Sequence, residues 1–258
     1  MKILILGDIY GSVATNTIVK HLGALKQRVN ADLTIANGEN VSTNGKSMTF
    51  KDYKTLKSAG VDYFTMGNHT FKIKEIHEYI DSADMVKPAN FQHDLPGADY
   101  KIFEIKGKKI LLFNLLGKAF MYNQKLDNPF HVADQILDNL EYDIGILDFH
   151  AEATSEKVVL GNYLKDKLSI FYGTHTHVAT ADERIIGKMA YVTDVGFTGI
   201  LNSAIGANFK EVEHTLVNES PAMFVEATEG SVRINAILVT IDDKTNAATA
   251  IERIIIDD

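Results

Sequence analysis

The sequence predicts an α/β fold built around a largely parallel β-sheet. In the first 70 residues, short apolar runs alternate with segments whose apolar residues recur at helical spacing. Each apolar run ends in glycine or polar residues, as expected for strands whose carboxyl ends meet at one edge of a sheet. The 258 residues are 45% hydrophobic and 23% charged, which excludes a disordered chain. We expect one domain over residues 1–258, because no Pro/Ser-rich linker, low-complexity tract or internal repeat divides the chain.

The first part of the chain alternates strands and helices. The first helical segment carries Val13, Ile18 and Leu22 at the spacing of one buried face. The second helical segment ends at Gly60, a residue that commonly terminates helices. The expected elements are strands at 2–7, 33–36 and 61–66 and helices at 12–29 and 49–59.

The rest of the chain is richer in strands. Two apolar runs flank Gly107-Lys108 and predict a β-hairpin, and the last third resembles a β-meander. We expect the strands within 100–116 and 222–256 to form a second sheet. The expected elements are strands at 100–106, 109–116, 144–149, 168–172, 184–187, 190–193, 222–228, 231–241 and 248–256, and helices near 131–141 and 155–167.

Composition excludes several classes of function. With 26 basic and 34 acidic side chains the formal net charge is −8, so no stable complex with a nucleic acid is expected. The absence of cysteine excludes disulfides, thiolate metal sites and cysteine nucleophiles. No stretch approaches the roughly 20 apolar residues of a membrane span, so we expect a soluble, cytoplasmic protein without a membrane partner. We also expect a homo-oligomer, since symmetric oligomers are common, although the sequence points to no interface.

Five apolar runs end in side chains that can bind metal ions. In an open α/β sheet, ligands bind beyond the carboxyl ends of the strands, so segments far apart in the sequence can converge on one site. The donors are nitrogen and oxygen atoms without sulfur, which suits Mn, Fe or Zn. These residues are Asp8; Glu39 and Asn40; Asn68 and His69; His150; and His175 and His177.

The number of donors favours two metal ions. Without His69, the set holds three imidazoles, two carboxylates and two carboxamides, too many for one tetrahedral zinc. Two ions about 3.5–4 Å apart generate a hydroxide near neutral pH and clamp a phosphoryl group during in-line attack. With two carboxylates and a hydroxide the local charge is about +1, which suits a phosphodiester monoanion even in an acidic protein.

Structural interpretations of the same residues remain open at this point. Asp8 could end a strand or cap a helix, and Glu39, Asn40 and Asn68 are ordinary turn residues. Two histidines at i and i+2 after an apolar run, as at His175 and His177, favour a metal site. We interpret the other histidines as structural or solvated. They are His21, His77, His93, His131 and His214.

The motif series resembles that of the calcineurin-like metallophosphoesterase superfamily. The motifs are Gly7-Asp8, Gly67-Asn68-His69, His150 and Gly173-Thr174-His175-Thr176-His177. Further segments are similar to its YmdB-like branch, known as 2′,3′-cyclic-nucleotide 2′-phosphodiesterases, and the resemblance spans residues 1–258. These segments are Gly38-Glu39-Asn40, residues 174–178, residues 180–184 and Thr193-Asp194-Val195-Gly196.

The resemblance implies a sandwich of two mixed β-sheets flanked by helices, with two divalent ions, iron or alternatively manganese, at the carboxyl ends of the strands. It implies that Glu39 bridges the ions and that His69 is the general acid that protonates the leaving alkoxide, a role worth about 10²–10⁴-fold. A hydroxide that bridges the ions would attack the phosphorus. The implied ligands are Asp8, Glu39, Asn40 and His177 for the first ion, and Glu39, Asn68, His150 and His175 for the second.

Three positions depart from the wider superfamily. Tyr10 stands where a histidine ligand is usual, so Asn40 is expected to replace it. The bridging residue is Glu39 instead of aspartate. Thr70 occupies the position of an acidic residue, so the orientation of His69 must come from elsewhere in the chain.

The expected function is therefore a metal-dependent phosphodiesterase that opens the 2′ bond of small 2′,3′-cyclic nucleotides. One alternative keeps the site but takes monoesters, as a nucleotidase does. The motifs hold no Arg or Lys for a dianion, which favours diesters. The other alternative is a regulatory protein that binds metal or nucleotide with little turnover.

Overall fold

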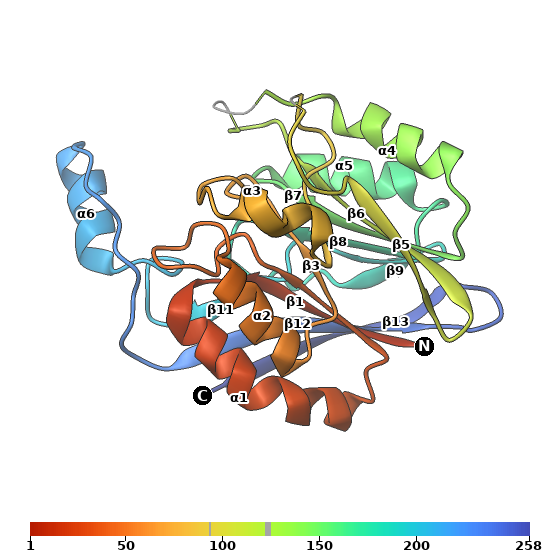
Figure 1. Cartoon of the computed structure of the whole chain (residues 1–258), viewed down its shortest axis with the longest axis horizontal. Helices are drawn as coiled ribbons and strands as arrows, with labels where there is room; N and C mark the ends of the chain where they lie inside the picture. The colour runs from red at the N-terminus through yellow and green to blue at the C-terminus, as the bar shows by residue number, and fades with distance from the viewer. Residues whose placement is uncertain (93, 122–124) are drawn as a thin grey trace.

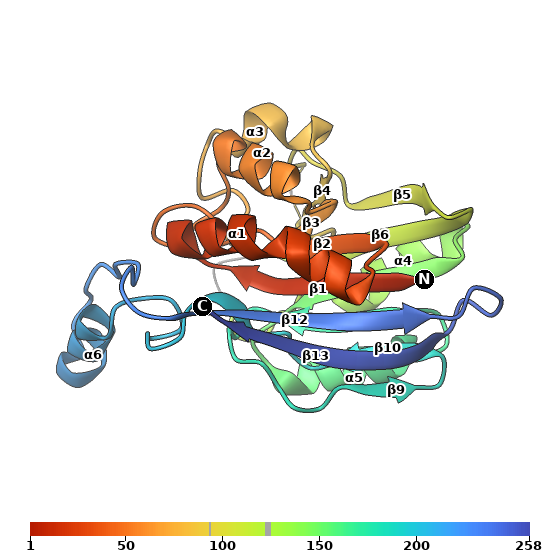
Figure 2. The same ribbon diagram turned by 90° about the horizontal axis from the view of Figure 1, so that it is seen from below.

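The protein is described by a computed structural model that covers residues 1–92, 94–121 and 125–258. His93 lies outside these described residues. Two mixed β-sheets pack face to face, and helices cover their outer faces (Figure 1). Helices α1 and α2 lie on one side and α5 on the other, with the strands between them (Figure 2). The predicted α/β class with two mixed sheets is therefore confirmed.

The first sheet has seven strands in the order β13-β12-β11-β1-β2-β3-β4. Strand β1 is central: it runs parallel to β2 and β11 and antiparallel to β12, with Lys2 opposite Thr240. The strands are β1 (Lys2–Ile9), β2 (Leu33–Asn37), β3 (Tyr63–Thr65), β4 (Met85–Val86), β11 (Phe197–Ile200), β12 (Val232–Ile241) and β13 (Ala248–Asp257).

The second sheet has six strands in the order β5-β6-β7-β8-β10-β9. Its central strands β6, β7 and β8 run parallel, so their carboxyl ends meet at one edge. The strands are β5 (Tyr100–Ile105), β6 (Lys108–Leu116), β7 (Ile144–His150), β8 (Ile170–Thr174), β9 (Arg184–Ile186) and β10 (Met189–Val192).

The helices begin and end at residues suited to those positions. Thr49 caps α2 in a capping box with Asp52, and Gly60 ends the helix at φ 111°. Asn128 caps α4, whose first residue is Pro129. None of the described helices is long and apolar enough to cross a membrane. The helices are α1 (Gly11–Val29), α2 (Phe50–Ala59), α3 (Ile76–Tyr79), α4 (Pro129–Asn139), α5 (Thr154–Leu164) and α6 (Phe209–Asn218), with a 3-10 turn at Ile80–Ser82.

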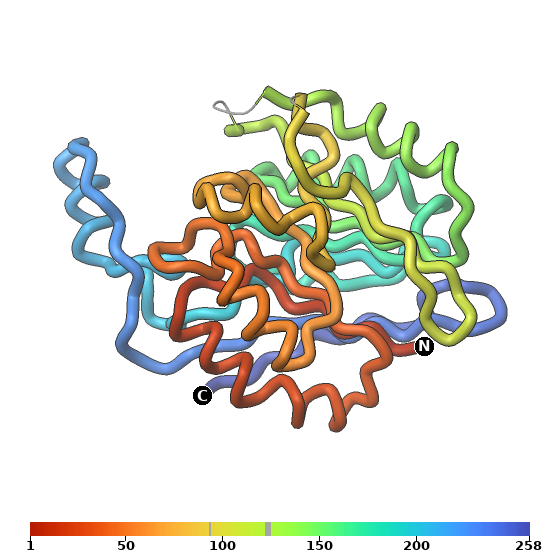
Figure 3. Tube along the Cα trace, in the orientation of Figure 1, coloured from red at the N-terminus to blue at the C-terminus, as the bar shows by residue number. Residues whose placement is uncertain are grey.

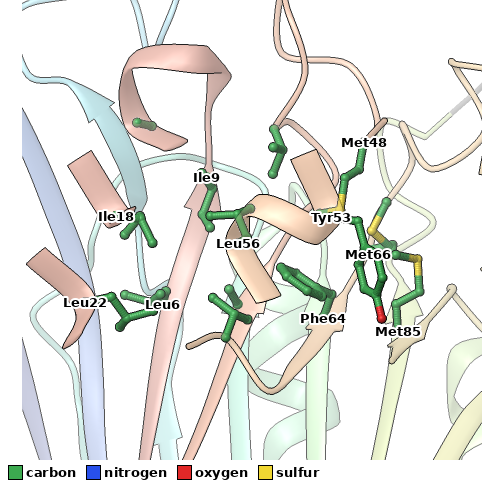
Figure 4. Packing of buried hydrophobic residues seen from close by; sticks show 14 of the residues in the cluster. Leu6, Ile9, Ile18, Leu22, Met48, Tyr53, Leu56, Phe64, Met66 and Met85 are labelled. Carbon is green, nitrogen blue, oxygen red and sulfur yellow. The ribbon is translucent and has the colours of Figure 1, made fainter. Parts of the chain in front are cut away.

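The core follows from the alternation of side chains along the buried strands. In β1, Ile3 and Ile5 face the second sheet, whereas Leu4 and Leu6 face the helices. On the helix side, Leu6 packs near Ile18 and Leu22 of α1 (Figure 4). Both faces of β1 are thus buried, which explains why the strand is a continuous apolar run.

Two expectations about the last third of the chain are wrong, and two of its elements were not expected. Residues 222–228 form no strand: Val225 is exposed, and Glu226 contributes only an isolated bridge to Ala207. Strand β11 and helix α6 lie in segments for which no element was expected. Strands β12 and β13 belong to the first sheet, because β12 pairs with β1, whereas the hairpin β5–β6 does belong to the second sheet.

Candidate metal centre

The candidate donors come from both sheets and meet where strands end. In the first sheet, Asp8 lies near the end of β1, Glu39 and Asn40 follow β2, and Asn68 and His69 follow β3. In the second sheet, His150 ends β7, and His175 and His177 follow β8. The contacts below connect all eight residues, so this convergence agrees with the expectation from the strand pattern.

Four of these side chains point at one another around His150. Its Nε2 atom lies 3.1 Å from Glu39 Oε1, 3.0 Å from His175 Nδ1 and 3.0 Å from Asn68 Oδ1. Within the described residues, Glu39, His150 and His175 form a group whose ligand atoms all lie within 4.8 Å of one another. These are the nitrogen and oxygen donors that a divalent transition-metal ion prefers.

The remaining donors lie beside this group. Asn40 Oδ1 is 3.2 Å from His177 Nε2, and the Oδ2 atom of Asp8 accepts a hydrogen bond from the His175 backbone at 3.2 Å. The other carboxylate oxygen, Asp8 Oδ1, is buried and has no hydrogen-bond partner among the described residues. A buried carboxylate oxygen without a donor is costly, so this atom fits a position that faces a cation.

Burial and mutual charge shift the pKa values of the cluster. Burial raises the pKa of Asp8 well above its usual value. Burial also acts to raise the pKa of Glu39, but the charge and hydrogen bond of His150 outweigh burial and lower it. The same pairing raises the pKa of His150 to about 9, although burial opposes this.

The other two histidines of the cluster shift in the opposite direction. Burial lowers the pKa of His177. Burial, together with the nearby charge of His150, lowers the pKa of His175 to about 3. Neutral imidazoles beside buried carboxyl groups fit a bound cation.

Gly67 leaves the space that the cluster needs. A Cβ atom at this position would lie 2.2 Å from Glu39 Oε2 and 2.6 Å from His150 Nε2. The turn after Gly67 then wraps around Glu39, whose Oε2 accepts a hydrogen bond from the His69 backbone at 2.7 Å. Thr70 closes this turn by donating its hydroxyl to the Gly67 carbonyl at 2.6 Å. Thr70 therefore shapes the turn that carries His69.

The imidazole of His69 is oriented by residues of the loop that follows β2. Its Nδ1 atom lies 3.3 Å from the Gly45 carbonyl and 3.1 Å from Asn40 Nδ2. The side chain is 34% exposed, so it reaches the pocket instead of being enclosed in the protein. Gly45 and Asn40 thus supply the orientation that the sequence could not assign.

The buried carboxylate of Asp148 orients His150 through the hydroxyl of Thr174. Asp148 accepts hydrogen bonds from the hydroxyls of Thr174 at 2.6 Å and Thr65 at 2.5 Å and from Asn37 Nδ2 at 3.0 Å. Because Thr174 donates its proton to Asp148, its oxygen accepts from His150 Nδ1, 2.9 Å away. Nε2 is therefore the nitrogen of His150 that would face a metal ion, an arrangement typical of metal-binding histidines.

A buried ion pair shapes the loop that carries His175 and His177. Lys157 is fully buried and donates to Asp194 Oδ2 at 2.7 Å and to the Thr174 carbonyl at 2.8 Å. The same Asp194 oxygen accepts from the backbone and hydroxyl of Thr176 at 3.2 and 2.8 Å. Both histidines have positive φ values, 98° and 61°, a strained conformation that this pair holds in place.

Asp148 and Lys157 lie outside the motifs and were not among the predicted site residues. The available signal was an aspartate inside the apolar run of β7 and a lysine on α5, whose side chains are expected at the surface unless paired. Among the described residues, the histidines outside the motifs make other contacts. His21, for example, pairs with Asp258.

Five of the eight candidate residues line a pocket of about 770 Å³. Its lining includes Glu39, Asn40, His69, His175 and His177. Residues within 204–224 also line the pocket, and those that do are apolar. The candidate metal centre is therefore open to a ligand the size of a small organic molecule.

The profile of the YmdB-like protein family matches residues 4–254 of this chain. The chain belongs to the YmdB-like family. The Bacillus subtilis protein named 2′,3′-cyclic-nucleotide 2′-phosphodiesterase is 40% identical over 262 residues, which cover 100% of this chain and 98% of that protein. The family resemblance predicted from the motifs is thus confirmed.

Two solved structures resemble this YmdB-like chain along its whole length. A crystal structure described as a novel phosphatase from Mycoplasma pneumoniae has a TM-score of 0.95 and 37% identity, covering 100% of this chain and 93% of that one. A hypothetical protein from Thermus thermophilus has a TM-score of 0.94 and 33% identity, with both chains covered completely. The two-sheet architecture is therefore the metallophosphoesterase-like fold of this family.

Proposed function

We propose that this protein is a metal-dependent phosphodiesterase that opens the 2′ bond of 2′,3′-cyclic nucleotides. The observation that carries the proposal is the convergence of seven nitrogen and oxygen donors, Asp8 Oδ1 among them without a partner in the described structure. The name of the Bacillus subtilis relative supports the choice of substrate. We also propose that residues 1–258 form one domain, and the homo-oligomer stays a prediction.

We propose two divalent ions, iron or alternatively manganese, at this centre. Asp8, Glu39, Asn40 and His177 would hold the first ion. Glu39, Asn68, His150 and His175 would hold the second, with Glu39 shared. When bound, the ions supply Lewis-acid stabilisation of the phosphoryl oxygens and activate water. The buried carboxylates and neutral imidazoles are the ligands that such ions require.

The proposed role of His69 is to protonate the leaving ribose oxygen. This oxygen has a high pKa, so a positioned proton donor lowers the barrier to its departure. His69 is partly exposed in the pocket, and Gly45 and Asn40 hold its Nδ1 edge. That arrangement leaves Nε2 as the atom that transfers the proton.

The charge of the pocket supports a diester over a monoester. Lys46 is the one Lys or Arg among the described residues that line the pocket. A dianionic monoester favours several cationic donors, whereas a diester carries a single negative charge. The nucleotidase alternative therefore has less support from this lining.

The test is cleavage of 2′,3′-cyclic AMP by protein stripped of metal and supplied again with Fe(II), without oxygen, or with Mn(II). Turnover that depends on metal and yields the 3′-phosphate supports the proposal. A 2′-phosphate product, or faster turnover of 3′-AMP than of the cyclic ester, overturns it. So does the absence of turnover despite two bound metal equivalents, which favours the binding-protein alternative. Glu39→Gln is the negative control, because loss of the shared carboxylate should abolish metal-dependent turnover.

A further inference from the structure

Residues 201–227, here called the arm, project away from the two sheets. Figure 1 shows α6 standing clear of the body, and the trace in Figure 3 leaves the body and returns to it beside β12. No residue of α6 is buried. Several large apolar side chains of the arm are instead exposed, among them Met223, which is 78% exposed, and Phe224, which is 48% exposed. The packing of the core therefore does not explain these side chains.

The base of the arm is fixed to the candidate metal centre. The Ile205 carbonyl accepts a hydrogen bond from His177 Nδ1 at 2.7 Å, so the arm helps to orient a proposed metal ligand. On the returning segment of the arm, Glu226 accepts from the Ser12 backbone at 2.8 Å and from the Asn44 backbone at 3.3 Å. Both ends of the arm are thus held against the body near the pocket.

The arm also lines the pocket into which the candidate metal centre opens. The part of the lining outside the arm holds the charged and polar groups described above. The part contributed by the arm is apolar and includes Ile205, Val212, Ala222, Met223 and Phe224. A ligand that fills both halves needs an anionic end at the metal centre and an apolar, flat end at the arm.

We propose that the arm binds the nucleobase of the substrate, with Met223 and Phe224 as the residues that determine specificity for a nucleoside ester. This inference rests on the proposed function, because it places the cyclic phosphate of the same molecule at the metal centre. A base can stack on the Phe224 ring, and the flexible Met223 thioether can follow its shape. Because stacking tolerates every base, the arm selects nucleosides over base-free esters and discriminates little among bases.

The experiment compares two substrates that share the reacting group. They are 2′,3′-cyclic AMP and ribose 2′,3′-cyclic phosphate, which lacks the base. We compare kcat/KM for the nucleotide with kcat/KM for the base-free ester. In Phe224→Ala the ratio of these two values falls about 10-fold, because the KM for the nucleotide rises. Met223→Ala lowers the ratio less. Leu216→Ala, a matched control on the exposed surface of α6, keeps the wild-type ratio.

A second measurement needs neither metal nor turnover. Saturation-transfer NMR with adenosine, which has no phosphate, should give transfer to the base protons in wild type and Leu216→Ala and lose it in Phe224→Ala. An unchanged substrate ratio and unchanged transfer in Phe224→Ala overturn the inference. So does a change of oligomeric state in that variant, which would make the arm a contact between copies of the chain.

The two proposals fail in distinguishable ways. If wild type cleaves neither ester but the adenosine signal depends on Phe224, the reaction is misassigned and the base site stands. If wild type cleaves both esters equally well and Phe224→Ala changes neither, the reaction stands and the base site is wrong.

Discussion

The Nδ1 atom of His150 lies 2.9 Å from the hydroxyl of Thr174. That hydroxyl donates in turn to Asp148, which is fully buried between the two sheets. The tautomer of a proposed metal ligand thus depends on a carboxylate that is closed off from solvent. The effect of Asp148 on the metal centre can be measured separately from the effect of the ligands themselves.

Asp148→Asn should lower the affinity for Mn(II) by about 10–100-fold, as is typical when the hydrogen-bonding support of a metal ligand is lost. An amide cannot accept at both positions where the carboxylate now meets donors from Thr65, Asn37 and Thr174. Calorimetric titration of metal-free protein measures the effect. Asp166→Asn changes an exposed aspartate and serves as the control. Equal affinities in the two variants would show that Asp148 has no influence on the ligands.

His69→Ala should reduce kcat on 2′,3′-cyclic AMP by about 10²–10⁴-fold, because the leaving ribose oxygen loses its proton donor. The loss should be much smaller on a diester with a p-nitrophenolate leaving group, which departs without protonation. Initial rates on both substrates, with metal content checked, give the comparison. His131→Ala, at an exposed histidine, is the matched control. A similar loss on both substrates contradicts the proton-donor role.

Lys157→Met should destabilise the metal-free protein by about 3–5 kcal/mol, because it leaves Asp194 buried without its cation. The double variant Lys157→Met/Asp194→Asn should lose less free energy of unfolding than the sum of the two single variants. Urea denaturation provides these values, with the exposed Lys51→Met as control. Strict additivity would mean that the two side chains do not interact.

Asp182 should make stability depend on pH in a defined direction. Burial acts to raise its pKa, but hydrogen bonds from Thr180, Thr193 and Arg184 outweigh burial and hold the pKa below 3.8. Folding therefore favours the ionised form, so its stabilisation is complete above pH about 4 and is lost as the pH falls through the folded-state pKa. Asp182→Asn should be less stable than wild type at pH 7 and pH 5, with the difference shrinking towards pH 3. Urea midpoints at the three pH values test this, and a difference that widens below pH 4 contradicts it.

The sequence could predict the strands that are buried on both faces, because continuous apolar runs leave few other structures. It could not predict which sheet takes β12. Its apolar residues fit either sheet, and its pairing of Thr240 with Lys2 spans most of the chain. Helix α6 was missed although Phe209, Val212 and Leu216 recur at helical spacing. The neighbouring run at 222–228 resembles a strand in its apolar residues, but Met223, Phe224 and Val225 are exposed in the structure.

The candidate donors could be predicted because each follows an apolar run, where parallel strands bring residues together. The side chains that support them could not be predicted. A lysine on a helix, such as Lys157, belongs to the surface in most proteins, and nothing local indicates that its partner is Asp194. Ile205 accepts the hydrogen bond from His177 with its backbone carbonyl. Every residue type carries this group, so the sequence could not indicate the contact.

The place of β1 has a consequence for how the chain is made. On one side β1 pairs with β12, and about 220 residues separate the end of β1 from the start of β12. At a synthesis rate of about 5–20 residues per second, β12 leaves the ribosome roughly 10–45 s after β1. During that interval one edge of β1 presents unpaired backbone groups to whatever else is nearby. The strand made before the rest of its sheet is therefore among the last to gain both neighbours.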